Sequence, residues 1–397
     1  MSDHKPKQTI GVGMVGAGFM AAAHSQAWRT VGRFFDLPAS PVMVGLCSRR
    51  PEAAQASAQR LGWGTAEPDF WQLIERDDVD LVDIVTPGDS HAEIAIAALE
   101  AGKHVLCEKP LANTVEQAAA MAEAAERARS RGVRSMVGFT YRRVPAVALS
   151  RQLVEAGRLG RIRHVRAQYL QDWIVDPSFP LVWRLRRDQA GSGALGDIGA
   201  HIIDLAQYVM GQRITGVSGL TETFIRERPL PAESSGLSAT GSSGRGTVTV
   251  DDAALFLARF DGGAIGTFEA TRFATGRKNG IHIEINGSDG SLYFDFESMN
   301  ELYLYDGREP AETAGFRRIL VTEVVHPYVA AWWPPGHLLG YEHSFTHQAR
   351  DLVVAIAAGT DPEPSFADGL RVQQVMAAVE TSAGANSAWA TVEGGIR

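Results

Sequence analysis

The chain has 397 residues, with 38 Lys or Arg and 46 Asp or Glu, so its formal net charge is −8. This length allows two or three domains, each with its own hydrophobic core. The acidic surplus argues against a surface that binds nucleic-acid phosphates or anionic lipids. A hydrophobic fraction of 45% and a charged fraction of 21% are typical of a folded globular protein and exclude a disordered chain.

Cysteine content and the N-terminal segment indicate the compartment. Cys47 and Cys107 are the only cysteines and form no Cys-x-x-Cys motif, which excludes a disulfide framework and fits a reducing compartment. Residues 1–10 are polar and lack the apolar region of a signal peptide, and no segment approaches the ~18 apolar residues of a membrane span. We therefore expect a cytoplasmic protein with no membrane partner.

Continuous apolar segments alternate with helix-like segments in the first third of the chain. The predicted strands and helices occupy residues 9–15, 19–29, 42–47, 52–61, 81–86, 91–100 and 104–107. Strands that are apolar throughout are typical of a parallel sheet whose two faces are covered by crossover helices. We therefore predict an α/β fold that begins with a doubly wound Rossmann domain, residues 1–141.

Beyond residue 141 the pattern changes to strict alternation. Residues 162–170 and 248–306 alternate polar and apolar side chains, and Asn286-Gly287 and Asp306-Gly307 are turn signals, which together predict antiparallel strands. We expect residues 142–397 to form an α+β domain for substrate binding and oligomer contacts. Its core element would be a large open sheet that is mostly antiparallel.

Helical and loop-like segments surround this predicted sheet. Residues 200–210, 345–358 and 369–383 have helical periodicity, and the last two are expected to close the fold. Residues 234–246 are rich in Ser and Gly, which predicts a mobile loop.

The motif Gly16-x-Gly18-x-x-Ala21 lies where the first predicted strand gives way to the first helix. Residues without side chains let the backbone approach a pyrophosphate, and the N-terminus of a helix favours its negative charge. An ordinary glycine turn is the alternative, but the strand before and the helix after favour a dinucleotide site. Phe19 and Met20, which begin the helix, are expected to line the same site.

The end of the second predicted strand bears on the choice between NAD and NADP. NAD-preferring folds usually place an acid there for the ribose hydroxyls, whereas this chain has Ser48, Arg49 and Arg50. A guanidinium can pair with a 2′-phosphate, so we expect NAD(P) as cofactor, with NADP slightly favoured. The alternative is a solvated basic start of a helix.

Two clusters carry the residue types that alcohol oxidation needs. Lys109 follows a buried strand at the sheet edge where open α/β folds bind ligands, and Asp197 and His201 share one face if their segment is helical. Histidine titrates near neutral pH and suits removal of the hydroxyl proton as hydride leaves carbon, while the lysine would stabilise the alkoxide. A solvated lysine and a helix cap beside a satisfied histidine are the alternatives.

In this order, the motifs resemble the glucose-fructose oxidoreductase and inositol dehydrogenase family, Gfo/Idh/MocA. The resemblance rests on the glycine motif and on three further motifs, Asp83-Ile84-Val85-Thr86-Pro87, Glu108-Lys109-Pro110 and Asp197-x-x-x-His201. It implies a Rossmann domain followed by an α/β domain whose open sheet often forms an oligomer interface, so we expect a homo-oligomer, dimer or tetramer.

The resemblance also implies an activity and the residues that carry it. Members mostly interconvert alcohol and ketone on sugars and cyclitols with NAD(H) or NADP(H). Lys109, Asp197 and His201 would be the catalytic residues, with His201 as the acid/base. The residues expected to complete the nicotinamide side of the cofactor site are Thr86, Pro87, His91, Glu108 and Lys109.

Further segments bear on the substrate. Tyr141-Arg142-Arg143 and Tyr169-Leu170-Gln171-Asp172-Trp173 resemble the branch of this family that holds levoglucosan dehydrogenase and other pyranoside 3-dehydrogenases, although members of that branch carry an acid where this chain has Ser48-Arg49. Residues 326–337 are aromatic and irregular, and form either a sugar-facing loop or an oligomer contact. Arg142, Trp173 and His326 are therefore candidate sugar contacts, together with Asp197 and His201.

The sequence therefore predicts an NAD(P)-dependent oxidoreductase that oxidises a secondary hydroxyl of a sugar, anhydrosugar, glycoside or cyclitol. A redox-assisted glycosidase and a cofactor-binding sensor without turnover are the alternatives. No metal is expected, because His343-x-x-x-His347 has zinc-like spacing but lacks a third ligand nearby.

Overall fold

The computed structural model describes residues 8–235 and 238–393. They form two compact units. The first contains the described residues up to Thr140 together with Tyr341–Leu370, and the second contains Tyr141–Ser234, Ser238–Gly340 and the described residues from Arg371 onward. Residues 341–370, which the sequence pattern places in the second domain, pack with the first unit.

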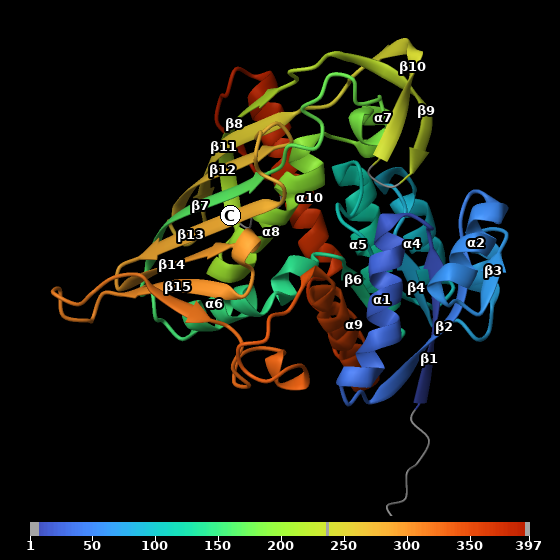
Figure 1. The fold of residues 1–397 in the computed structure, drawn as a ribbon, viewed down its shortest axis with the longest axis horizontal. Helices are drawn as coiled ribbons and strands as arrows, with labels where there is room; N and C mark the ends of the chain where they lie inside the picture. The colour runs from blue at the N-terminus through green and yellow to red at the C-terminus, as the bar shows by residue number, and fades with distance from the viewer. Residues whose placement is uncertain (1–7, 236–237, 394–397) are drawn as a thin grey trace, which may run out of the picture. The chain divides into compact units, whose positions relative to one another are not determined.

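The first unit is built on a sheet whose neighbouring strands all run parallel, in the order β3-β2-β1-β4-β5-β6 (Figure 1). Its strands are β1 Gln8–Val15, β2 Ala39–Cys47, β3 Thr65–Glu67, β4 Leu81–Ile84, β5 His104–Cys107 and β6 Ser135–Val137. The order reverses between β1 and β4, and ligands of open α/β sheets bind at the carboxyl ends of strands at such a point. The predicted doubly wound parallel sheet is confirmed.

Helices lie between these strands along the chain, and α9 joins them from much later in the sequence. Their bounds are α1 Phe19–Phe34, α2 Pro51–Leu61, α3 Phe70–Glu75, α4 His91–Glu100, α5 Val115–Arg129 and α9 Tyr341–Ala358. Asp69 and Thr114 cap α3 and α5 by accepting backbone N–H groups, and Pro51 occupies the first turn of α2. The helices predicted over 19–29, 52–61 and 91–100 are thereby confirmed, the first with a longer C-terminal end.

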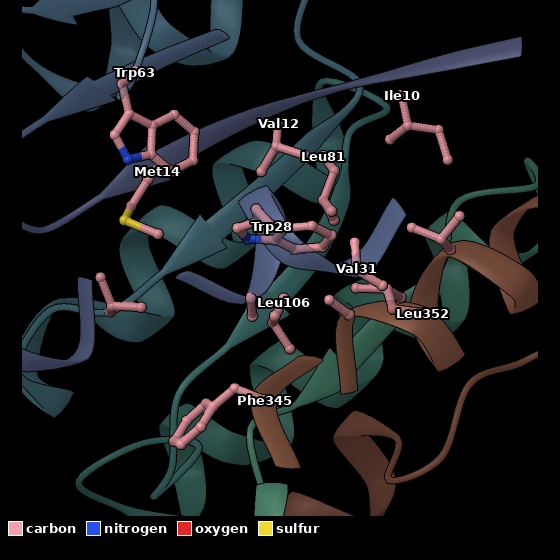
Figure 2. Close-up of a cluster of buried hydrophobic side chains, with 14 of the residues drawn as sticks. Ile10, Val12, Met14, Trp28, Val31, Trp63, Leu81, Leu106, Phe345 and Leu352 are labelled. Atoms are coloured by element: carbon pink, nitrogen blue, oxygen red, sulfur yellow. The ribbon is translucent and has the colours of Figure 1, made fainter. Parts of the chain in front are cut away.

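A cluster of buried hydrophobic side chains in the first unit joins α1 and α9 to the sheet. Trp28 and Val31 on α1 and Leu352 on α9 are at most 3% exposed, and Figure 2 shows them beside Leu106 of β5. Side chains of this size each contribute about 1.5–3 kcal/mol when they are buried. This burial explains why residues 341–358, although late in the sequence, belong to the first unit.

The second unit is dominated by a sheet in the order β16-β15-β14-β13-β7-β12-β11-β8-β17 (Figure 1). The strands are β7 Ile162–Leu170, β8 Ile214–Glu222, β11 Ala253–Phe260, β12 Ile265–Thr271, β13 Gly280–Gly287, β14 Gly290–Asp295, β15 Glu301–Asp306, β16 Arg317–Leu320 and β17 Ala390–Thr391. β7 and β12 pair in parallel, and the other neighbouring pairs are antiparallel. This confirms the predicted mostly antiparallel sheet.

The two faces of this sheet differ. Helices α6 Pro145–Glu155 and α8 Ala200–Met210 pack on one face. On the other face Leu255, Leu257 and Ile265 are 42%, 55% and 50% exposed. Helix α10, Phe366–Gly384, confirms the helix predicted at 369–383, and the short helix α7 spans Arg187–Ala190.

The Ser/Gly-rich segment was wrongly predicted to be a mobile loop. In its described part Ser238–Thr247 forms strand β10, which pairs with β9, Glu227–Ser235; residues 236–237 lie outside the described residues. Leu230 of β9 lies across Gly244 and Gly246, where an added Cβ would stand 3.0 Å from its methyl carbons. Pairing and this cover compensate for the weak strand propensity of glycine, which single-sequence reasoning does not detect.

In the part of the chain that the structure describes, no helix is both long and apolar enough to cross a membrane.

Candidate active site

The turn between β1 and α1 fits a dinucleotide pyrophosphate. Gly16 has φ +126°, and a Cβ there would lie 2.8 Å from the Val85 side chain, so only glycine fits. Gly18 is exposed, and a Cβ there would meet nothing within 4 Å. No side chain caps α1 and its first turn holds no acidic residue, so its N-terminal N–H groups suit an anion.

The residues next to this turn are placed on the same edge of the sheet. Phe19 is 47% exposed and stacks on Tyr341 of α9 with ring centroids 6.4 Å apart, and Met20 is half-buried. Ser48 and Arg49 follow β2, the parallel neighbour of β1, and the Ser48 hydroxyl donates to the Arg50 carbonyl over 3.0 Å. Arg49 is exposed at this edge.

Two loops at the carboxyl ends of β4 and β5 carry the remaining cofactor candidates. Thr86 and Pro87 follow β4, and Lys109 follows β5 with a cis peptide bond to Pro110. His91 joins the loops, because its Nδ1 lies 3.0 Å from the Pro110 carbonyl and its Nε2 lies 2.9 Å from the Thr86 carbonyl. The ring is buried, which lowers its pKa, and it holds the two loops together rather than offering a polar atom to the nucleotide.

A buried charged cluster underlies these loops, and the sequence analysis missed two of its members. His24 of α1 lies between Asp83 of β4 and Glu108, with Nδ1 2.9 Å from Asp83 Oδ1 and Nε2 3.0 Å from Glu108 Oε1. The two carboxylates raise the pKa of His24 to about 10 against the opposing effect of burial. An acid inside the apolar strand Leu81–Ile84 is the signal that could have found this cluster, because buried carboxylates require partners.

In the second unit, a residue from the segment before β11 fixes the start of the helix that carries Asp197 and His201. Leu195–Gly199 forms a π-helical turn that continues into α8, so the predicted helix is present with a wider first turn. The Asp251 carboxylate accepts the N–H groups of Gly193 and Leu195 over 2.7 and 2.8 Å. A Cβ on Gly193 would lie 1.7 Å from the Asp251 carbonyl oxygen, which explains the glycine.

Two arginines that are not among the predicted site residues, Arg184 and Arg272, lie beside Asp197. Arg272 is fully buried, and its Nη1 lies 3.6 Å from Asp197 Oδ2 and 3.4 Å from the Arg184 carbonyl oxygen. Arg184 stacks over the Trp183 ring at 4.4 Å. Burial lowers the pKa of Arg184, while the charge of Asp197 opposes this shift. The Arg184 guanidinium makes no hydrogen bond to any residue within the described ranges.

His201 is held among aromatic rings. It is 7% exposed, and its ring lies 4.6 Å from that of Tyr141 and 5.8 Å from that of Tyr169. The two tyrosine hydroxyls are 3.0 Å apart, and the Tyr169 hydroxyl donates to Asn279 Oδ1 over 2.7 Å. This hydrogen-bonded pair fixes the rings that surround the imidazole.

The other predicted sugar contacts have different surroundings. Trp173 lies beside Arg272, whose guanidinium is 5.9 Å from the centre of the tryptophan ring. Arg142 is buried and donates to Asp204 over 2.8 and 2.5 Å, which gives it a structural partner. His326 serves a local turn, where its Nδ1 accepts the N–H of Glu323 over 3.0 Å.

No group of three or more His, Cys, Asp or Glu residues in the described part of the chain could hold a metal ion.

Comparison with known proteins gives the family. A model described as "Oxidoreductase family, NAD-binding Rossmann fold" matches residues 10–139, and one described as "GFO/IDH/MocA C-terminal domain" matches residues 147–293. Levoglucosan dehydrogenase of Pseudarthrobacter phenanthrenivorans is 43% identical over 390 residues, which cover 97% of this chain and 98% of the relative.

Solved structures agree over almost the whole length. An oxidoreductase domain protein from Kribbella flavida is 67% identical with a TM-score of 0.93, and levoglucosan dehydrogenase in complex with NADH and levoglucosan is 43% identical with a TM-score of 0.91. Each comparison covers 97% of this chain and 99% of the other. The chain therefore belongs to the Gfo/Idh/MocA family of oxidoreductases, and its first unit is the family's NAD-binding Rossmann domain.

Proposed function

We propose that this protein is an NAD(P)-dependent dehydrogenase that oxidises a secondary hydroxyl of a sugar, anhydrosugar, glycoside or cyclitol. One observation carries the proposal. A single helix start, anchored by Asp251 from the segment before β11, carries both Asp197, which lies beside Arg272 and Arg184, and His201, which lies among aromatic rings. The Arg272 guanidinium in turn lies over the Trp173 ring. An acid, a base, donors and an aromatic face are the groups that a polyhydroxylated substrate requires.

The residues divide the work of the oxidation. His201 accepts the proton of the reacting hydroxyl, and the Lys109 ammonium stabilises the negative charge that develops on that oxygen. Asp197, kept beside the Arg272 guanidinium, accepts a hydrogen bond from a substrate hydroxyl and orients the sugar. A nicotinamide cofactor held at the glycine turn after β1 would supply the acceptor for the hydride that leaves the carbon. The proposal requires Lys109 and His201 to act on the same oxygen.

The arginine and tryptophan side chains set the substrate class. A guanidinium only donates hydrogen bonds, so Arg184 suits an oxygen that accepts, such as a ring, bridging or glycosidic oxygen. The Trp173 ring, held edge to face against Phe179 at 5.2 Å, offers a flat surface for the C–H face of a pyranose. These groups favour a cyclic sugar or glycoside over an open-chain polyol.

The proposal also covers the choice of cofactor, the association of the chain with itself and the compartment. NADP is slightly preferred, because Arg49 is exposed beside the edge that binds the nucleotide and can pair with a 2′-phosphate. The exposed face of the large sheet, with Leu255, Leu257 and Ile265, associates with a second copy of the chain. Cys47 and Cys107 are free and buried, which fits a reducing, cytoplasmic compartment.

Replacing Lys109 by Ala or His201 by Asn should lower kcat by about 100- to 10,000-fold in a screen of sugars and cyclitols that follows nicotinamide reduction. Nucleotide affinity, measured by fluorescence titration, should change less than about threefold because neither change removes the pyrophosphate site. The double variant should lose little more than the worse single one. His164→Asn on the sheet serves as control. Undiminished turnover in Lys109→Ala contradicts the proposal, and aglycone release without net reduction selects the glycosidase alternative.

Arg184→Gln should raise KM for a glycoside or anhydrosugar by about 10- to 100-fold, because a charge-assisted hydrogen bond to the substrate is lost. The kcat should stay within about threefold, since Arg184 does not move the proton or the hydride. Arg186→Gln, an exposed arginine paired with Asp188, is the matched control. Equal KM values in the two variants would remove Arg184 from the substrate site.

Arg49→Asp should shift the ratio of kcat/KM for NADP over NAD by about 10- to 100-fold toward NAD, because the carboxylate repels a 2′-phosphate and accepts from ribose hydroxyls. Arg60→Asp, at the other end of α2, controls for the change in net charge. A ratio unaltered by Arg49→Asp would mean that this edge does not read the 2′ position.

A further inference from the structure

The Asp83–His24–Glu108 cluster joins elements from distant parts of the sequence. His24 is on α1, Asp83 on β4, and Glu108 follows β5, and they are 1%, 0% and 4% exposed. The imidazole Nδ1 lies 2.9 and 3.0 Å from the two Asp83 oxygens, and Nε2 lies 3.0 Å from Glu108 Oε1. Because each ring nitrogen faces a carboxylate, the arrangement suits an imidazolium that donates from both sides.

Neighbouring side chains fix the ring and its first partner. The Phe345 ring of α9 lies 5.3 Å from the His24 ring, and the Trp28 indole donates to Asp83 Oδ2 over 2.7 Å. Both aromatic residues belong to the core in Figure 2. The imidazole therefore has a fixed position from which it can orient Glu108.

Glu108 passes this constraint to Lys109. Its second oxygen, Oε2, accepts the backbone N–H of Lys109 over 3.2 Å. The other oxygen, Oε1, packs against Gly138. A Cβ at residue 138 would lie 2.6 Å from this oxygen, so the carboxylate requires a glycine there. The two oxygens of one side chain thus link the His24 ring to the main chain that carries the lysine.

Stability alone is a poor explanation for this cluster. Burying two carboxylates and an imidazolium removes three charged groups from water, and apolar side chains of similar volume often stabilise a protein as well or better. The cluster instead resembles the shells that lock a functional group in its working position.

We infer that His24 is a positioning residue, which through the Glu108 carboxylate fixes the main chain at Lys109 and so aims the lysine at the reacting oxygen. This inference rests on the proposed function, because it assigns Lys109 the role described above. Displacing a reacting group by about 1 Å can cost about 100-fold in rate, so the main-chain anchor has a measurable consequence.

The test compares His24→Gln with Trp28→Phe in the full-length protein. Glutamine is neutral and has one donating nitrogen where the imidazolium has two, so it cannot reproduce the contacts of both ring nitrogens with the two carboxylates. The Trp28 variant removes another donor to Asp83 and leaves the His24–Glu108 contact in place. His24→Gln should lower kcat by about 30- to 100-fold, with sugar KM and nucleotide Kd within about threefold. Trp28→Phe should keep kcat within about threefold.

Two further measurements separate positioning from simple loss of folded enzyme. Nucleotide-binding stoichiometry gives the competent fraction, and deuterium at the oxidised carbon should give a larger isotope effect on kcat in His24→Gln, since slowed hydride transfer then limits turnover. If His24→Gln does not fold, Glu108→Gln, which keeps the side-chain volume, should likewise lower kcat and raise the isotope effect.

The inference fails if His24→Gln, corrected for competent fraction, turns over as fast as Trp28→Phe, or if its isotope effect is unchanged. Failure of the proposed function is a separate result, in which Lys109→Ala itself retains full rate. A slow Lys109→Ala with a fast His24→Gln would overturn only the positioning role.

Discussion

A charged side chain shared between two buried carboxylates organises the working edge of the first unit. His24 joins α1 to the ends of β4 and β5, next to the place where the strand order reverses. Breaking a buried ionic contact by removing one partner costs about 3–5 kcal/mol, so these elements cannot readily separate. The glycine turn after β1 and the loop that carries Lys109 thereby keep their places on one sheet edge.

In the second unit, too, buried charged side chains hold the residues of the candidate site in place. Asp251 reaches from the segment before β11 to the start of the Asp197 helix, and Arg272 spans Asp197 and the Arg184 carbonyl. In both units a functional residue at the end of a regular element is fixed by a charged side chain remote in sequence. Such anchoring gives the precision that catalysis requires without extra loops.

Much of this architecture could be predicted from the sequence, for physical reasons. Apolar strand segments such as residues 10–15 of β1 indicate a sheet covered on both faces, and the alternation of β11 indicates a sheet with one exposed face. The strand β10 could not be predicted, because glycine-rich strands depend on a partner such as Leu230. The placement of α9 could not be predicted either, since an apolar helix face does not specify what it packs against.

In the candidate site, too, local features could be predicted from the sequence and long-range contacts could not. Lys109, Asp197 and His201 lie in recognisable local motifs, whereas the pairing of Arg142 with Asp204 and of His24 with Asp83 joins residues 62 and 59 positions apart. The sequence shows which residues are charged, but it does not show which residue each of them contacts in the fold. This is why the sequence predicts Arg142 as a sugar contact without indicating that it pairs with Asp204.

Nitrogen-15 NMR of the His24 ring tests the central claim most directly. The signals of a ¹⁵N-histidine sample are assigned by their loss in His24→Gln, and the ring is then titrated. Because the flanking carboxylates raise the pKa of His24 to about 10, both ring nitrogens should stay protonated from neutral pH to about pH 9. A ring that loses its proton near the ordinary value of about 6.5 would contradict the charged bridge and the account built on it.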